Sequence, residues 1–135
     1  MIFQILLKMS PFQKNLYFVI SGLFFLFAVV QWNDPDPLIW MIFYGAISLI
    51  YILLALEKKL AYYLSVLMLI TCIINMGLIL PEIMKWINDG MPSIVQSMKA
   101  TIPTIEYTRE FLGLLLCLIA CVWVIRVHKT TIINN

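Results

Sequence analysis

The segment Gln31–Trp40 reads QWNDPDPLIW and separates two long apolar runs. Within ten residues it places two amide residues, two acidic residues and two prolines. A residue that precedes proline is disfavoured in the helical region, so Asp34 and Asp36 are expected to be extended. The segment is therefore predicted to be a turn between two helices.

The runs on either side of this turn are long enough to cross a membrane. The chain has 135 residues, of which 63% are hydrophobic and 12% are charged, whereas a soluble domain is about 45–50% apolar and about 25% charged. A spanning helix needs roughly 17–25 mostly apolar residues. Four windows meet this requirement, at about 16–32, 37–56, 60–80 and 109–127. The sequence predicts an all-α integral membrane four-helix bundle that forms one domain over residues 1–135.

Two segments outside the spans are predicted to be short interfacial helices. The first is the N-terminal MIFQILLKM, which is apolar on one side and ends before Pro11. The second segment is the loop 81–103, which is predicted to form two short helices, because apolar residues recur at helical spacing on both sides of Gly90 and Pro92. Both are expected to lie on the membrane surface.

The charged residues predict the orientation of the chain. The N-terminus, the second loop and the C-terminal tail hold six Lys or Arg and one acid, while the first and third loops hold three basic residues and six acids. Basic residues favour the cytoplasmic side, so both termini are expected there. The multi-pass chain is expected in a plasma membrane, and its many Ile, Lys and Asn residues hint at a bacterial inner membrane.

The two acids of the turn differ in how well a purely structural role explains them. Pro37 suits the first position of a helix, and Asp36 just before it suits the N-cap. Asp34 is explained less fully, either as a cap of the preceding helix or as an Asx-turn. Neither role explains why a carboxylate is placed at the depth of the lipid headgroups.

The start of the last span carries a second acidic pair. Glu106 and Glu110 are four residues apart and share one face of a helix. A favourable helix-dipole position explains Glu106, whereas Glu110 lies beyond the first turn, where ionisable residues usually face the bundle interior and have a partner. Arg109 lies beside them and can bridge to Glu106 or to the turn. Small residues that suit close helix packing follow, among them Gly113, Cys117 and Cys121.

All four spans thus bring polar or aromatic residues to one outer layer. This candidate functional cluster consists of Gln31, Asn33, Asp34, Asp36, Trp40, Tyr44, Asn75, Glu106, Arg109 and Glu110. The inner half holds no comparable layer, which argues against a continuous transport path.

Several of these residues also match a known family. The string Asn33–Pro37 follows the first span, Trp40 and Tyr44 come after it, and Arg109 and Glu110 open the last span. In these features and in its layout, the chain resembles the transmembrane protein 220 family of small four-helix membrane proteins. The resemblance implies this architecture and a shared outer polar motif, and it implies no substrate.

Three functions remain open from the sequence. The favoured one is a non-enzymatic subunit or scaffold of a membrane complex, whose partners would be the lipid bilayer and another membrane protein or a second copy of the chain. The first alternative is an outer-leaflet enzyme or binding site for a lipid or amphiphile that uses Asp34 and Glu110. The second is binding of a hard cation by the acidic residues.

Other functions are disfavoured. The single histidine, His128, lies in the tail, so neither a zinc nor a haem site is expected. No Ser-His-Asp set can assemble on one face. The net charge of +2 and the absence of a basic run disfavour nucleic acid as a partner. No cofactor is expected.

Overall fold

A computed structural model of the chain describes residues 9–94 and 103–133, and this part of the chain folds into four long helices. They are α2 (Pro11–Val30), α3 (Pro37–Ala55), α4 (Leu60–Asn88) and α5 (Pro103–Ile133), and a short 3₁₀ helix η1 (Gln31–Asn33) extends α2. Each long helix contains a segment that is long and apolar enough to cross a membrane, which confirms the predicted all-α bundle. The predicted N-terminal interfacial helix falls mostly on residues outside the described ranges.

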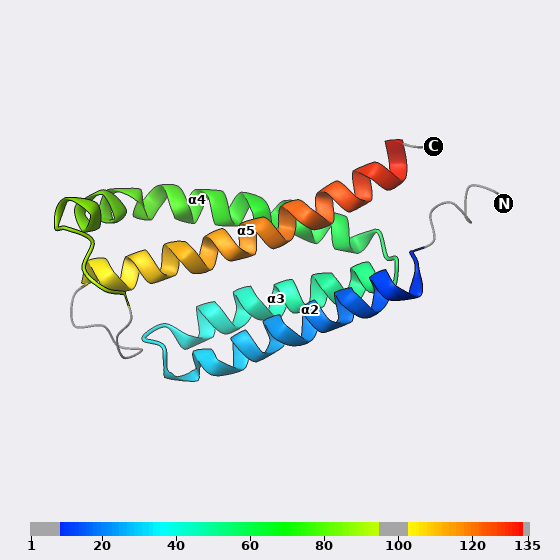
Figure 1. Ribbon diagram of the computed structural model, residues 1–135, viewed down its shortest axis with the longest axis horizontal. Helices are drawn as coiled ribbons and strands as arrows, with labels where there is room; N and C mark the ends of the chain where they lie inside the picture. The colour runs from blue at the N-terminus through cyan, green and yellow to red at the C-terminus, as the bar shows by residue number, and fades with distance from the viewer. Residues whose placement is uncertain (1–8, 95–102, 134–135) are drawn as a thin grey trace.

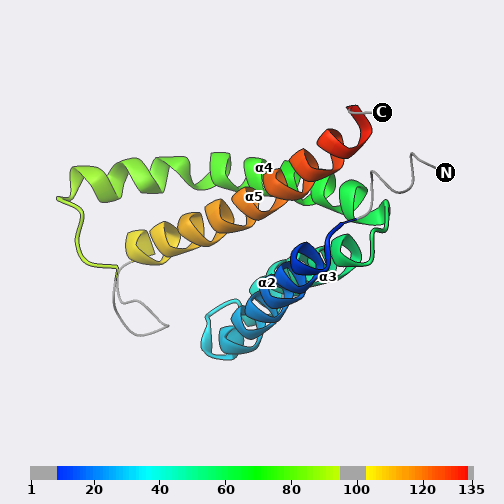
Figure 2. The same cartoon turned by 45° about the vertical axis from the view of Figure 1, so that its right-hand side comes forward.

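The four helices form two antiparallel hairpins, α2–α3 and α4–α5, whose axes are inclined to one another (Figures 1 and 2). Backbone contacts are most extensive within each hairpin, and α3 is the helix of the first hairpin that contacts both α4 and α5. The start of α2, the α3–α4 turn and the end of α5 lie together at one end of the bundle, here called the basic end (Figure 1). The opposite end, with the QWNDPDPLIW turn and the start of α5, is called the acidic end.

Two serines hold the first hairpin together in the membrane-spanning region. The Ser21 hydroxyl donates to the backbone oxygen of Ser48 at 2.8 Å, and the Ser48 hydroxyl donates to the backbone oxygen of Ser21 at 2.9 Å. The two hydroxyl oxygens are 3.0 Å apart, and both side chains are buried. Small residues at such a seam let two helix backbones approach closely. The reciprocal pairing therefore fixes the register of α2 against α3.

A double-mutant cycle on this pair is expected to show coupling. Ser21→Ala and Ser48→Ala should each lower the free energy of unfolding by about 0.5–1.5 kcal/mol, and the double variant should lose less than the sum of the two. Unfolding in mixed micelles, followed by circular dichroism, gives the free energy of unfolding of the native chain, the two single variants and the double variant. Strictly additive losses would mean that the hydroxyls act independently.

The structure differs from the sequence-based expectation at the end of the third span. The segment that contains Ile83, Met84 and Ile87 was expected to be a separate interfacial helix, but α4 continues without a break through Pro81 to Asn88. Proline removes a single hydrogen bond, whereas ending the helix would leave four backbone carbonyls to satisfy in an apolar medium. Positive φ angles at Gly90 and Met91 follow the end of α4, and most of the second expected helix lies in residues 95–102, outside the described part.

At the basic end, one carboxylate ties the start of α2 to the α3–α4 turn. Glu57 accepts a hydrogen bond from the backbone N–H of Met9 at 2.6 Å, and its other oxygen lies 3.4 Å from the Lys14 ammonium. Both charged side chains are partly exposed, so the ion pair adds little stability. Its main effect is to fix the position of the start of α2 relative to the α3–α4 turn.

Candidate functional site

The QWNDPDPLIW turn has a defined geometry. Asp34 is extended, with φ −71° and ψ 151°, as its position before Pro35 predicted. Its Oδ2 accepts a hydrogen bond from the backbone N–H of Asp36 at 2.9 Å, which is the expected Asx-turn. Asp36 occupies the N-cap position of α3, but its φ of −119° and ψ of 62° are not extended and its side chain makes no capping hydrogen bond, so both expectations for Asp36 are wrong. The Asp36 carboxylate lies instead near those of Glu106 and Glu110 in α5.

A polar cavity of about 180 Å³ lies between the two hairpins at the acidic end. The first hairpin and its turn contribute polar and aromatic residues, and the first two turns of α5 contribute charged ones. Its lining consists of Gln31, Asp34, Trp40, Tyr44, Glu106, Arg109 and Glu110. These seven residues all belong to the cluster that the sequence predicted.

Three carboxylates gather beside this cavity. Single carboxylate oxygens of Asp36, Glu106 and Glu110 all lie within 4.8 Å of one another, and the two glutamates are only partly exposed. Like charges at this distance repel, and a cation placed among them would relieve the repulsion. Arg109 lines the same cavity. The oxygen donors also suit a hard cation such as magnesium or calcium.

Two aromatic side chains form the rigid wall of the polar cavity. Trp40 and Tyr44 are only 6% and 8% exposed, and their ring centroids are 5.7 Å apart. The Tyr44 ring also packs against Phe24 and Phe27, at centroid distances of 6.2 and 5.9 Å. Aromatic neighbours on several sides leave these rings little freedom to move. The shape of this wall is therefore already fixed in the protein without a ligand.

Gly113 of α5 makes room for this wall. A Cβ atom at this position would lie 2.7 Å from the Tyr44 hydroxyl oxygen and 3.2 Å from Cζ3 of Trp40. Cys117 and Cys121, further along the same helix, are fully buried free thiols. These three residues are the packing positions proposed from the sequence, and Gly113 is the one that adjoins the candidate site.

A second cavity of about 140 Å³ adjoins the first. It shares Trp40 and Glu110 with the polar cavity and adds Asp36 and Asn75, whose amide group donates to the backbone oxygen of Thr71 at 2.8 Å. Its other walls are apolar and consist of Ile39, Phe43, Ile79 and Leu114. The sequence reasoning missed these four residues, because apolar side chains within spans carry no local signal. Only the spacing of Ile39 and Phe43 around Trp40 hinted that they share its side of α3.

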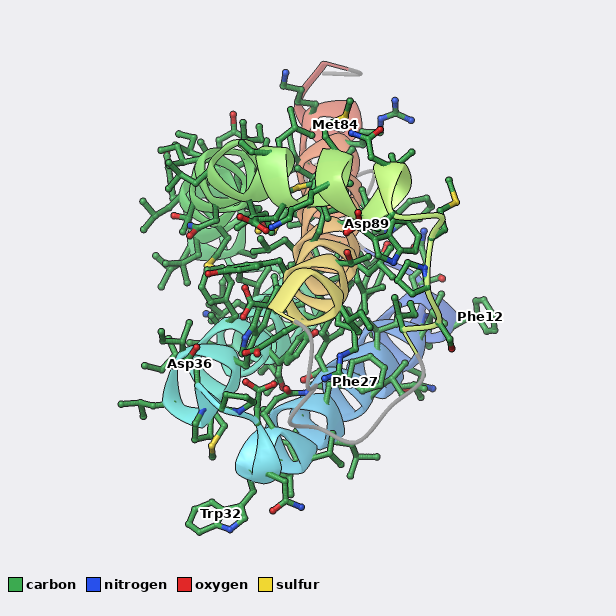
Figure 3. All side chains as sticks on the ribbon, turned by 90° about the vertical axis from the view of Figure 1, so that its left-hand side faces the viewer. Phe12, Phe27, Trp32, Asp36, Met84 and Asp89 are labelled. Carbon is green, nitrogen blue, oxygen red and sulfur yellow. The ribbon has the colours of Figure 1, made fainter. Side chains whose placement is uncertain are left out.

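The structure therefore unites nine of the ten residues in the predicted cluster around two adjoining cavities. The exception is Asn33, which is exposed in η1 and lines neither cavity. Its neighbour Trp32 is 76% exposed and projects away from the bundle (Figure 3). The same view shows Asp36 at the start of α3 and Asp89 past the end of α4.

Fold and sequence together define an α-helical, multi-pass membrane protein. A family model described as transmembrane family 220, helix, matches residues 23–126. The match covers more than half of the chain, and the chain therefore belongs to transmembrane family 220. No match was found among curated proteins or among solved structures.

Proposed function

We propose that this membrane protein binds the polar head of a lipid or small amphiphile at its acidic end. The observation that supports this function best is the polar cavity between the hairpins, where carboxylates and Arg109 meet the wall of Trp40 and Tyr44. Ligand sites typically combine apolar and aromatic walls with a few convergent polar groups. The adjoining second cavity extends the site and adds four apolar residues beside Asp36, Asn75 and Glu110.

The charge distribution supports an outward-facing placement of this site. We place both termini in the cytoplasm of a bacterial cell, with the acidic end on the outer face of the inner membrane, because basic residues dominate the opposite end. The site then lies at the depth of the outer-leaflet headgroups. A lipid could enter it sideways without leaving the bilayer.

A second candidate is a non-enzymatic subunit or scaffold of a membrane complex. The observation that favours it is the low burial of α4, which is the least buried of the four spans. Its remaining surface is available to lipid or to a partner helix. In this case the polar cavity would hold a group of the partner protein.

Purification of the native chain and of a double variant, Asp34→Asn/Glu110→Gln, would test both candidates. The membrane is dissolved in a gentle detergent, and bound species are identified by native mass spectrometry and proteomics. We expect the native chain to retain an amphiphile and the double variant to lose it, because the variant removes two carboxylates from the cavity lining.

The matched control is Asp89→Asn, which removes an exposed acid at the end of α4 that lines neither cavity. It should retain the amphiphile. A stoichiometric protein partner that only the double variant loses would favour the subunit. Retention of the same amphiphile by all three proteins would refute a role of the cavity.

A further inference from the structure

Two hydrogen-bond donors in the wall of the polar cavity have no partner within residues 9–94 and 103–133. Among the described residues, neither the indole N–H of Trp40 nor the hydroxyl of Tyr44 makes a hydrogen bond, although both side chains are more than nine-tenths buried. In this part of the chain, no side-chain N or O atom that is sealed from solvent lacks a partner. Both donors must therefore reach accessible space, and the space that both residues line is the polar cavity.

Donors that open into a cavity favour an acceptor on a ligand. A ligand that enters the cavity displaces water, and it binds well only if it replaces the hydrogen bonds that water makes to such donors. Arg109 lines the same cavity and adds positive charge to it. An indole N–H and a hydroxyl beside a positive charge suit an anionic oxygen group such as a phosphate.

The three carboxylates favour a ligand that places a cationic group among them. A primary ammonium has three N–H donors in tetrahedral directions, and each charge-assisted N–H···O bond is about 2.7–2.9 Å long. Three acceptors arranged in this way around one nitrogen lie roughly 4.4–4.7 Å apart. The oxygens of Asp36, Glu106 and Glu110 lie within 4.8 Å of one another, which accommodates this arrangement.

We propose that the polar cavity recognises a zwitterionic headgroup that carries a primary ammonium and a phosphate. This inference rests on the proposed amphiphile-binding function and specifies the class of ligand. The ammonium lies among Asp36, Glu106 and Glu110, and the phosphate accepts from Trp40 and Tyr44. The apolar part of the ligand leaves along the apolar residues of the second cavity, which also contains Asp36 and Asn75 and shares Trp40 and Glu110 with the first.

This arrangement discriminates among common phospholipid headgroups. A phosphatidylglycerol has the phosphate but no cation for the carboxylates. A phosphatidylcholine has both charges, but its quaternary nitrogen has no N–H to donate. A phosphatidylethanolamine satisfies both groups of residues. Buried polar groups left unpaired by the wrong headgroup give strong discrimination.

The test uses the full-length chain in dodecyl maltoside and an equimolar mixture of the three phospholipids with identical acyl chains. Native mass spectrometry measures the ratio of bound lipids, and lipid titrations of the unfolding temperature measure the affinities. We expect phosphatidylethanolamine to bind at least about tenfold more tightly than either competitor, since one charge-assisted hydrogen bond changes the dissociation constant by about a factor of ten. Tyr44→Phe and Trp40→Phe should each weaken its binding about tenfold.

Trp32→Phe and Tyr63→Phe are the matched controls, because these side chains are 76% and 65% exposed. Both should bind phosphatidylethanolamine like the native chain. Equal binding of all three phospholipids, with loss in Glu110→Gln, would overturn the headgroup assignment and leave the proposed function intact. A rise of the unfolding temperature with millimolar calcium or magnesium alone, and none with any phospholipid, would overturn both.

Discussion

Replacing Gly113 by leucine is expected to lower the free energy of unfolding by about 2–3 kcal/mol and to abolish binding in the polar cavity. The new Cβ alone would lie 2.7 Å from the Tyr44 hydroxyl oxygen. Tyr44 cannot swing aside easily, because its ring packs against Trp40, Phe24 and Phe27. The wall of the cavity must move as a unit, and α5 must move away from α3.

Unfolding in mixed micelles and ligand retention in native mass spectrometry would measure the two effects. Gly113→Ala should lose less stability and less ligand binding than Gly113→Leu. The controls are Gly45→Ala and Gly77→Ala, where an added Cβ meets nothing within 4 Å. If all three alanine variants were equally stable and bound ligand equally well, the close approach of α5 to the aromatic wall would not exist.

Replacing Tyr51 by alanine is expected to have the largest effect on stability, a loss of about 3–5 kcal/mol. Tyr51 is 3% exposed, and its hydroxyl donates to the backbone oxygen of Ala120 at 2.9 Å. This hydrogen bond joins α3 to α5 and hence one hairpin to the other. The Tyr51 ring also contacts Tyr17 and Phe24, at centroid distances of 6.0 and 6.3 Å. The substitution therefore removes a core ring together with a link between the hairpins.

Tyr51→Phe separates these contributions, because it keeps the ring and removes only the hydroxyl. Its expected loss is about 1 kcal/mol, in line with single hydrogen bonds between membrane helices. Spin labels on the two hairpins should report a broader distance distribution in Tyr51→Ala than in the native chain. Tyr63→Ala is the control, since this side chain is 65% exposed. An equal loss in the control would show that burial of Tyr51 is not the cause.

Much of the fold can be predicted from the sequence because it depends on local chemistry. Apolar windows bounded by turn residues locate the four helices, and the prolines after Asp34 and Asp36 fix the turn. Two spans, α3 and α4, lie between the QWNDPDPLIW turn and the start of α5, so the turn and the start of α5 lie at the same end of the bundle. Asp34, Glu106 and Glu110 are therefore at the same end.

The remaining features depend on how helices rotate and pack. Pro81 reads as a helix breaker in isolation, but its effect in a membrane depends on the apolar surroundings, which favour continued backbone pairing. The exposure of Asn33, in contrast to the buried Trp40 and Tyr44, depends on the path of the chain through η1. The apolar walls at Ile79 and Leu114 arise only when two hairpins meet at a particular angle, which no periodicity specifies.

The hairpin architecture has a consequence for how the protein assembles. The two helices of each hairpin are consecutive in the chain, so their contacts form at lower cost in loop entropy than contacts of α2 or α3 with α5. Contacts between the hairpins connect residues as far apart as Tyr17 and Trp123, whose indole N–H donates to the Tyr17 hydroxyl. We therefore expect the two halves to form first in the bilayer, and docking of one half on the other to be the last step of folding. The candidate site comes into existence only with that step, since its aromatic wall and its glutamates belong to different halves.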